Sequence, residues 1–169
     1  WARFSWASSL FKLVIGLMLW IFVEGALYLS FGWQGPLTQM GWFFTKAALV
    51  TFGGAYAVLP YVYQGGVNEY KWLSATQMMD GLALGETTPG PLIMIVSFIG
   101  FVGGWTKELF GPEAQLLAGA AGASVATLFT FLPSFIFILI GAPLVEQSRN
   151  DMKLSAPLTA ITAAVVGVI

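Results

Sequence analysis

The sequence predicts an all-α integral membrane protein, and two features lead to that fold class. Of 169 residues, 57% are hydrophobic and 9% are charged, whereas a soluble domain carries about 25% charged residues. The apolar residues also gather in runs that could cross a bilayer, which takes about 20 residues of helix. We therefore expect a single transmembrane domain over residues 1–169, with about four full transmembrane helices and a truncated fifth.

The composition also excludes several classes of function. The chain contains neither Cys nor His, which excludes disulfides, thiolate metal sites and catalysis by Ser-His-Asp or Cys-His groups. No glycine-rich nucleotide-binding motif is present, and a net charge of −1 offers no basic surface to nucleic acid. An intramembrane enzyme would need an Asp pair, and Asp80 and Asp151 lie far apart in the sequence. We expect no enzymatic activity, no cofactor and no metal.

Residues 13–31 are predicted to form the first span, after an interfacial segment that begins at Trp1. The one charged residue of this span, Glu24, lies towards its far end. Its carboxylate either reaches the interface or has a role inside the membrane, because a charge at the bilayer centre costs about 2.5–3.5 kcal/mol. A turn at Gly35-Pro36 follows this span.

Residues 42–63 are predicted to form the second span, interrupted at Gly53-Gly54. Each glycine in a helix interior costs about 1 kcal/mol relative to Ala. The pair either allows close helix packing or marks an unwound point whose bare N–H groups face an anion. Lys46, near the start of the span, either extends to the interface or faces a polar cavity.

The stretch from residue 80 to residue 105 is predicted to be a broken transmembrane element. It contains Thr87-Thr88-Pro89-Gly90-Pro91, in which two prolines remove two backbone donors and push the preceding residues out of the α region. Backbone groups that a break frees in lipid must be satisfied by protein, ion or water. Interrupted helices are where transporters place their binding sites.

Polar groups surround this break. Thr87 and Thr88 carry hydroxyls, and a helix beginning at Pro91 would direct its positive dipole end to the same point, a combination that suits an oxyanion. The alternative is a proline kink in which the threonines bond back to their own helix. Glu86 precedes the break, and Asp80 is either a second functional carboxylate or an interfacial residue. A helix after Ser74, the expected N-cap, carries both acids.

Residues 116–140 are predicted to form the fourth span, kinked at Pro133, and residues from 156 onward begin a fifth. Small residues at four-residue spacing, such as Ala118 and Gly122, indicate close helix packing. The chain starts at Trp1 and stops inside an apolar run, so we expect it to be a fragment. If all four elements cross, the N-terminal side is cytoplasmic by the positive-inside rule, whereas a re-entrant third element removes that bias.

Two segments carry a resemblance to a known family. Residues 52–60, FGGAYAVLP, followed by residues 80–91, DGLALGETTPGP, look like the chromate ion transporter family in order and spacing. Residues 70–73, 132–133 and 141–143 also fit. The likeness covers about residues 41–169 and is strongest to the second half of two-domain members.

The resemblance implies export of chromate from the cytoplasm across the bacterial inner membrane. The driving force would be the membrane potential or a proton gradient, and the export would confer chromate resistance. It also implies two halves that face opposite ways, so the chain would pair with a homologous N-terminal half or a second copy. Sulfate has the same charge and shape as chromate and is an alternative substrate.

The residues and the resemblance together suggest a mechanism. The dianion would bind backbone N–H groups at Gly53-Gly54 and at residues 88–90, with the Thr87 and Thr88 hydroxyls as further donors and Lys46 as a compensating charge. Glu86, with Asp80, would act as a proton carrier or a gate, because an ionised carboxylate would repel the substrate. In a different class of function, the glycines and prolines would serve packing in a structural or assembly subunit.

Overall fold

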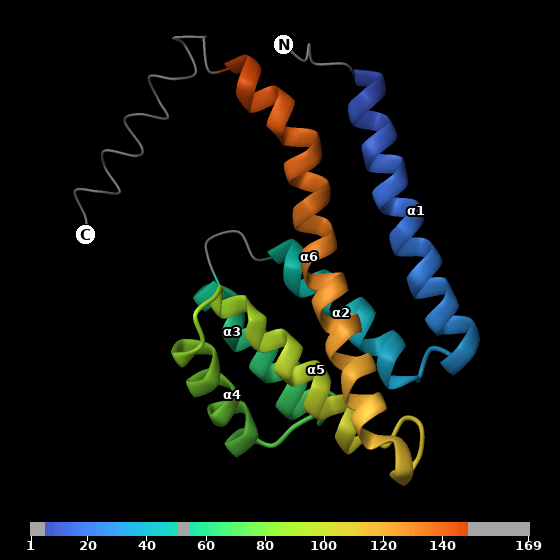
Figure 1. Ribbon diagram of the computed structural model, residues 1–169, viewed down its shortest axis with the longest axis vertical. Coiled ribbons are helices and arrows are strands. Elements are labelled where there is room, and N and C mark those ends of the chain that lie inside the picture. The colour runs from blue at the N-terminus through green and yellow to red at the C-terminus, as the bar shows by residue number, and fades with distance from the viewer. Residues whose placement is uncertain (1–5, 51–54, 149–169) are drawn as a thin grey trace, which may run out of the picture. The chain divides into compact units, whose positions relative to one another are not determined.

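The computed structural model describes residues 6–50 and 55–148, and the regular structure in these ranges is helical (Figure 1). The α-helices are α1 (Trp6–Phe31), α2 (Pro36–Val50), α3 (Ala55–Tyr63), α4 (Ala75–Thr87), α5 (Ile95–Thr106) and α6 (Gln115–Ser148). The shorter turns are η1 (Gln64–Glu69), which is π-helical, and η2 (Leu92–Met94) and η3 (Pro112–Ala114), which are 3-10 helices. The predicted all-α fold is confirmed.

Two helices within the described ranges are long and apolar enough to span a bilayer. They cover Ala7–Phe31 and Pro112–Pro143, and they correspond to the first and fourth predicted spans. A shorter apolar segment, Leu92–Thr106, follows the predicted break. The first span ends where Gly32 takes a φ of +72° and its N–H bonds to the Tyr28 carbonyl at 2.8 Å. Glycine favours this left-handed conformation at a helix end because it has no Cβ.

The second predicted span is divided between α2 and α3. The predicted interruption at Gly53-Gly54 falls outside the described residues. Beyond α3, the chain continues directly into η1. Gly65 and Gly66 are buried there, with Gly65 against the ring of Phe43, while Gln64, Asn68 and Glu69 are exposed. The Tyr70 N–H bonds to the Gly65 carbonyl at 2.9 Å, the five-residue step of a π-helix.

The chain divides into two compact units. The terminal unit comprises, in its described parts, residues 6–17 and 135–148, and the central unit is Met18–Ser134. In the terminal unit, α1 and α6 meet at Gly16, where an added Cβ would lie 2.5 Å from the side chain of Ile136. Lys12 also donates a hydrogen bond from Nζ to the Leu139 carbonyl at 3.2 Å.

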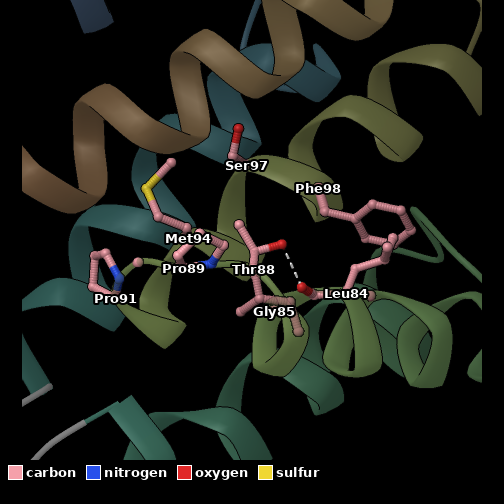
Figure 2. A pocket seen from close by; sticks show the side chains of 11 residues that line it. Leu84, Gly85, Thr88, Pro89, Pro91, Met94, Ser97 and Phe98 are labelled. Carbon is pink, nitrogen blue, oxygen red and sulfur yellow. Dashed lines mark hydrogen bonds between the residues drawn. The ribbon is translucent and has the colours of Figure 1, made fainter.

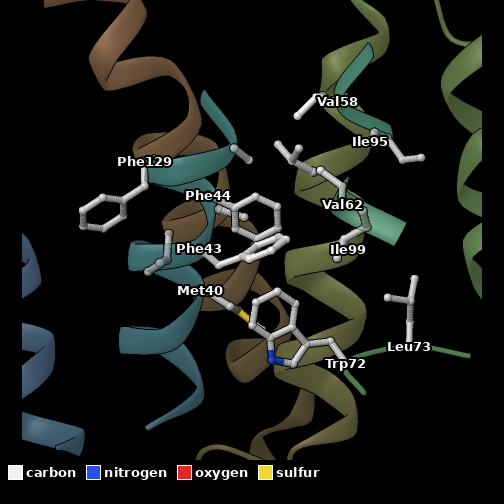
Figure 3. Packing of buried hydrophobic residues seen from close by; sticks show 14 of the residues in the cluster. Met40, Phe43, Phe44, Val58, Val62, Trp72, Leu73, Ile95, Ile99 and Phe129 are labelled. Atoms are coloured by element: carbon white, nitrogen blue, oxygen red, sulfur yellow. The ribbon is translucent and has the colours of Figure 1, made fainter. Parts of the chain in front are cut away.

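An aromatic core holds the central unit together (Figure 3). Trp72, which is fully buried, stacks on Tyr70 at 4.7 Å between ring centroids and meets Phe43 edge-on at 5.4 Å. Phe44 and Phe129 bring α2 and α6 into the same cluster. Each buried aromatic ring removes about 150–250 Å² from solvent, so this cluster fixes the connection between α3 and α4 against α2.

Helices α5 and α6 cross at glycines without intervening side chains. A Cβ added at Gly122 would collide with the Gly100 carbonyl oxygen, and one added at Gly104 would collide with the Ala118 carbonyl oxygen. The small-residue spacing in the sequence predicted this close packing, and the prediction is confirmed. Backbones that approach this closely gain dispersion contacts that larger residues would prevent.

Candidate functional site

The helix that leads to the break begins with a complete capping box. The Ser74 hydroxyl accepts a hydrogen bond from the Gln77 N–H at 3.2 Å, and the Gln77 side-chain oxygen accepts one from the Ser74 N–H at 2.8 Å. Two donors that the helix would leave unpaired are thereby satisfied. The predicted N-cap is confirmed, and α4 starts at a fixed residue on the approach to the site.

The predicted break is confirmed at the end of α4. Helix α4 ends at Thr87, and Thr88 turns into an extended conformation with φ −83° and ψ 128°. Pro91 is also extended, with φ −71° and ψ 131°, and α-helix resumes at Ile95 after the 3-10 turn η2. The sequence had placed the new helix at Pro91. The α-helix starts later because Pro91 lies in the N-cap position and the Met94 N–H bonds to its carbonyl at 2.9 Å.

A pocket of about 600 Å³ opens at this break (Figure 2). It is lined by Gly81, Leu84, Gly85, Thr88, Pro89, Gly90, Pro91, Met94, Ile95, Ser97 and Phe98. Among these described residues none carries a charge, and Thr88 and Ser97 supply the side-chain hydroxyls. The pocket therefore offers dipoles rather than a formal charge to a ligand.

The threonine hydroxyls at the break bond back to α4. Thr87 Oγ1 donates to the Ala83 carbonyl at 2.9 Å, and Thr88 Oγ1 donates to the Leu84 carbonyl at 2.6 Å, as Figure 2 shows for Thr88. Each hydroxyl has one proton. In this conformation both protons are engaged, and a hydroxyl must rotate away from its carbonyl before it donates to a ligand.

Glycines shape the pocket on two sides. At Gly81 an added Cβ would lie 2.5 Å from Phe98 Cδ1, so this glycine allows α4 to pack on α5. A Cβ added at Gly85 would lie 3.4 Å from the Leu92 side chain. Gly81 and Gly85, four residues apart on α4, thus both belong to a packing surface. At Gly90, by contrast, an added Cβ would have no heavy atom within 4 Å.

The backbone of Gly90 is accessible as a donor. Within the described ranges its N–H makes no hydrogen bond, and its neighbours Pro89 and Pro91 have no N–H to offer. Gly90 is exposed. An unpaired N–H at the mouth of the pocket is a group that an anion can use.

The predicted site residues do not all gather at this pocket. Thr88, Pro89, Gly90 and Pro91 line it, and Thr87 adjoins them at the end of α4. The remaining charged candidates, Asp80 and Glu86 on α4 and Lys46 on α2, are exposed and lie outside its lining. Gly53 and Gly54 lie outside the described residues.

Sequence reasoning missed Ser97 and the apolar wall around it. Ser97 lies on α5 and lines the pocket together with Met94 and Phe98. A signal was present, because Ser97 is the single hydroxyl residue between Leu92 and Trp105. Because Ser97 is separated from the proline motif along the sequence, it was not grouped with that motif as a site residue.

Long apolar helices together with an interrupted helical element define a helical integral membrane protein of the transporter type. The comparison with known families agrees: the chain belongs to the chromate transporter family, whose model matches residues 38–169. This is a family of transporters rather than enzymes.

Curated relatives of this chain are named as chromate transport proteins. The chain is 37% identical over 133 residues to a chromate transport protein of Cupriavidus metallidurans, and these 133 residues are 79% of this chain and 30% of that protein. It is 33% identical over 133 residues to a probable chromate transport protein of Synechococcus elongatus, with the same coverage. A chromate transport protein of Pseudomonas aeruginosa is 38% identical over 124 residues, 73% of this chain and 26% of that protein.

The chain thus spans about 30% of the length of the first two of these relatives. No solved structure matches it.

Proposed function

We propose that this chain forms part of a membrane transporter of a tetrahedral oxyanion, with chromate as the substrate. The observation that carries the proposal is the helix break at residues 88–91 and the pocket that it lines. Support for the substrate comes from relatives named chromate transport proteins. Transporters of several folds bind their substrates at interrupted helices, because only there are backbone groups free inside the membrane.

The pocket suits a hydrated oxyanion. Its volume of about 600 Å³ equals roughly twenty times the volume that one water occupies in the liquid. The Gly90 N–H would donate to one substrate oxygen, and Thr88 and Thr87 would donate to others after their hydroxyls rotate. Pro89 and Pro91 hold the backbone extended, so Gly90 is presented without an ordering cost on binding.

The substrate charge must be balanced from outside this lining. Lys46 would supply one positive charge to the anion, as would residues of a partner. The partner would be a homologous N-terminal half or a second copy of the chain. The complete assembly would lie in the bacterial inner membrane and cross it several times.

Two carboxylates on α4 would govern the coupling to an energy source. Glu86 lies in the last turn before the break, and Asp80 lies six residues earlier. An ionised Glu86 would repel a dianion at the pocket. We therefore assign Glu86 the role of proton carrier or gate and Asp80 a supporting role in the same step, driven by the proton gradient or the membrane potential.

The test is uptake of labelled chromate into inverted membrane vesicles that contain the protein, with sulfate as competitor. Saturable chromate uptake with only weak competition by sulfate supports a chromate transporter. Strong competition by sulfate points to a broader oxyanion transporter. If the protein neither binds nor takes up either anion, the proposal is overturned and a structural or assembly role remains.

Gly90→Ala provides the sharpest local test. The added methyl group meets no heavy atom within 4 Å and Gly90 has no positive φ, so the fold should be unchanged. The methyl group nevertheless narrows the approach to the N–H. Loss of one hydrogen bond to a charged group, about 1.5 kcal/mol, should weaken chromate binding roughly tenfold. Gly25→Ala, equally free of neighbours within 4 Å, is the matched control. Unchanged affinity in Gly90→Ala would refute the role of this amide.

A further inference from the structure

A second polar site lies in the central unit, where α1 faces α2. Glu24 is 7% exposed, although it belongs to the apolar span Ala7–Phe31. Its carboxyl group lies against Gly41 of α2, where an added Cβ would collide with Oε2 and would also come within 3.1 Å of the Phe129 ring. Of the two alternatives that the sequence left open, the structure supports a position inside the protein rather than at the interface.

Both carboxyl oxygens of Glu24 lack hydrogen-bond partners among the described residues. Two donors on the same helices are engaged with other acceptors. The Trp20 indole N–H, one turn away on α1, donates to Thr45 Oγ1 at 2.9 Å. Thr45 in turn donates to the Gly41 carbonyl at 2.7 Å. The protons of the Trp20 indole and the Thr45 hydroxyl are therefore both engaged and do not serve the Glu24 carboxyl group.

Among the described residues, no Lys or Arg side chain donates a hydrogen bond to this carboxyl group. Its neighbour on α2 is Gly41, which carries no charge. Lys46, five residues further along α2, is exposed, as is Tyr28, one turn further along α1. Burial of an unpaired carboxylate costs several kcal/mol, whereas a neutral acid avoids most of that cost. A proton on Glu24 resolves the conflict between its burial and its charge.

Thr38 is a second buried polar residue, on the same helix as Gly41. Thr38 is fully buried, and its hydroxyl also has no partner among the described residues. It lines a pocket of about 60 Å³ together with Trp33, Gln39, Trp42 and Tyr70. This volume exceeds what a water molecule needs, and water would satisfy the hydroxyl. Thr38 and Gly41 are three residues apart on one face of α2, a rise of about 4.5 Å.

We infer that Glu24 is a proton-binding site inside the membrane and that it exchanges its proton with solution by way of the pocket at Thr38. The carboxylate takes up one proton delivered by water and becomes a neutral acid, and the reverse step returns the proton to water. Neither step depends on the proposed oxyanion transport. The site is also separate from the pocket at the helix break, whose lining includes neither Glu24 nor Thr38.

Infrared spectroscopy of the whole protein in lipid tests the inference without requiring transport. A protonated carboxyl group has a carbonyl stretch that an ionised one lacks. At about pH 7 an exposed Glu is ionised, because its side chain titrates near pH 4.3 in water, roughly three pH units lower. The wild type should therefore show a protonated-acid band that Glu24→Gln removes and that the control Glu113→Gln, an exposed acid in η3, leaves unchanged. Glu24→Asp should shift the band, which keeps the test valid if the Gln variant does not fold.

The route is tested in the same samples by transfer to heavy water. Exchange of the carboxyl proton for deuterium shifts the band. Thr38→Val, which replaces the hydroxyl by a methyl group of similar size and leaves water without a polar partner there, should slow the shift severalfold. Absence of a protonated-acid band that depends on Glu24 would overturn the proton-binding site. An unchanged exchange rate in Thr38→Val would overturn the route through the pocket.

Discussion

The crossing of α5 and α6 makes a quantitative prediction for Gly122→Ala. The new Cβ would collide with the Gly100 carbonyl oxygen and would lie 2.9 Å from the Gly100 carbonyl carbon and 3.3 Å from Gly104 Cα. All three neighbours are backbone atoms, which no rotamer change can move. Because carbon atoms pack best at about 3.5–4.0 Å, the two helices must separate by roughly 1 Å.

The energetic cost follows from that separation. A gap of about 1 Å forfeits up to half of the dispersion energy of each contact along the crossing, and overpacking of this kind costs about 1–3 kcal/mol. Replacing Gly by Ala in a helix also stabilises it by about 1 kcal/mol. Gly25→Ala on α1 provides a control, because its Cβ would have no neighbour within 4 Å. The helix-propensity gain is the same in both variants, so the difference between them isolates the steric penalty of about 1–3 kcal/mol.

The assay is the free energy of unfolding in mixed micelles, titrated with a denaturing detergent and followed by tryptophan fluorescence. Gly122→Ala should unfold at a lower detergent fraction than Gly25→Ala. Equal stability of the two variants would refute the reasoning, since it would mean that α5 and α6 do not meet at their backbones.

Three further predictions concern the site and its approach. Ser74→Ala removes the capping box and should destabilise α4 by about 1 kcal/mol, which would be measured as faster hydrogen exchange in α4. The control is Ser124→Ala, which removes a hydroxyl bonded to the Ala120 carbonyl. Equally slow exchange of α4 in the two variants would contradict the prediction. Glu86→Gln should remove the pH dependence of chromate transport, and a retained pH profile would exclude the proton-carrier role. Burial, assisted by the Glu69 carboxylate, raises the pKa of the Tyr70 phenol, so the unfolded chain loses its proton first. Stability should therefore fall as pH rises above about 10, and Tyr70→Phe should reduce that fall in unfolding measurements.

Local signals in the sequence predicted the elements that local chemistry controls. Ser74 and Gln77 set the start of α4, and Pro89 and Pro91 forced its end, because these effects act within a few residues. The later start of α5 was not predicted, since a 3-10 turn after Pro91 differs little in sequence from a first α-helical turn.

Features that depend on distant contacts could not be predicted. Gly65 of η1 lies against the Phe43 ring of α2, and no local signal in the sequence links these two residues. The burial of Glu24 likewise depends on a glycine at position 41 of the facing helix, and no pattern in the sequence pairs these two residues. Thr88 illustrates a third limit: the sequence allowed either a free hydroxyl or a bond to its own helix, and the three-dimensional structure was needed to choose.

The glycine crossing also has a mechanical consequence for the pocket. At Gly100 and Gly104 the backbone of α5 meets α6 directly, so a tilt of α5 would pivot on this stretch. Ile95, at the pocket end of α5, lies five residues before Gly100, a lever arm of about 7.5 Å. A tilt of about 10° around this pivot would displace that end by roughly 1.3 Å, given the helical rise per residue. Such a displacement is comparable to the radius of a water molecule, so a small tilt of one helix would change the width of the pocket by about half a hydration layer.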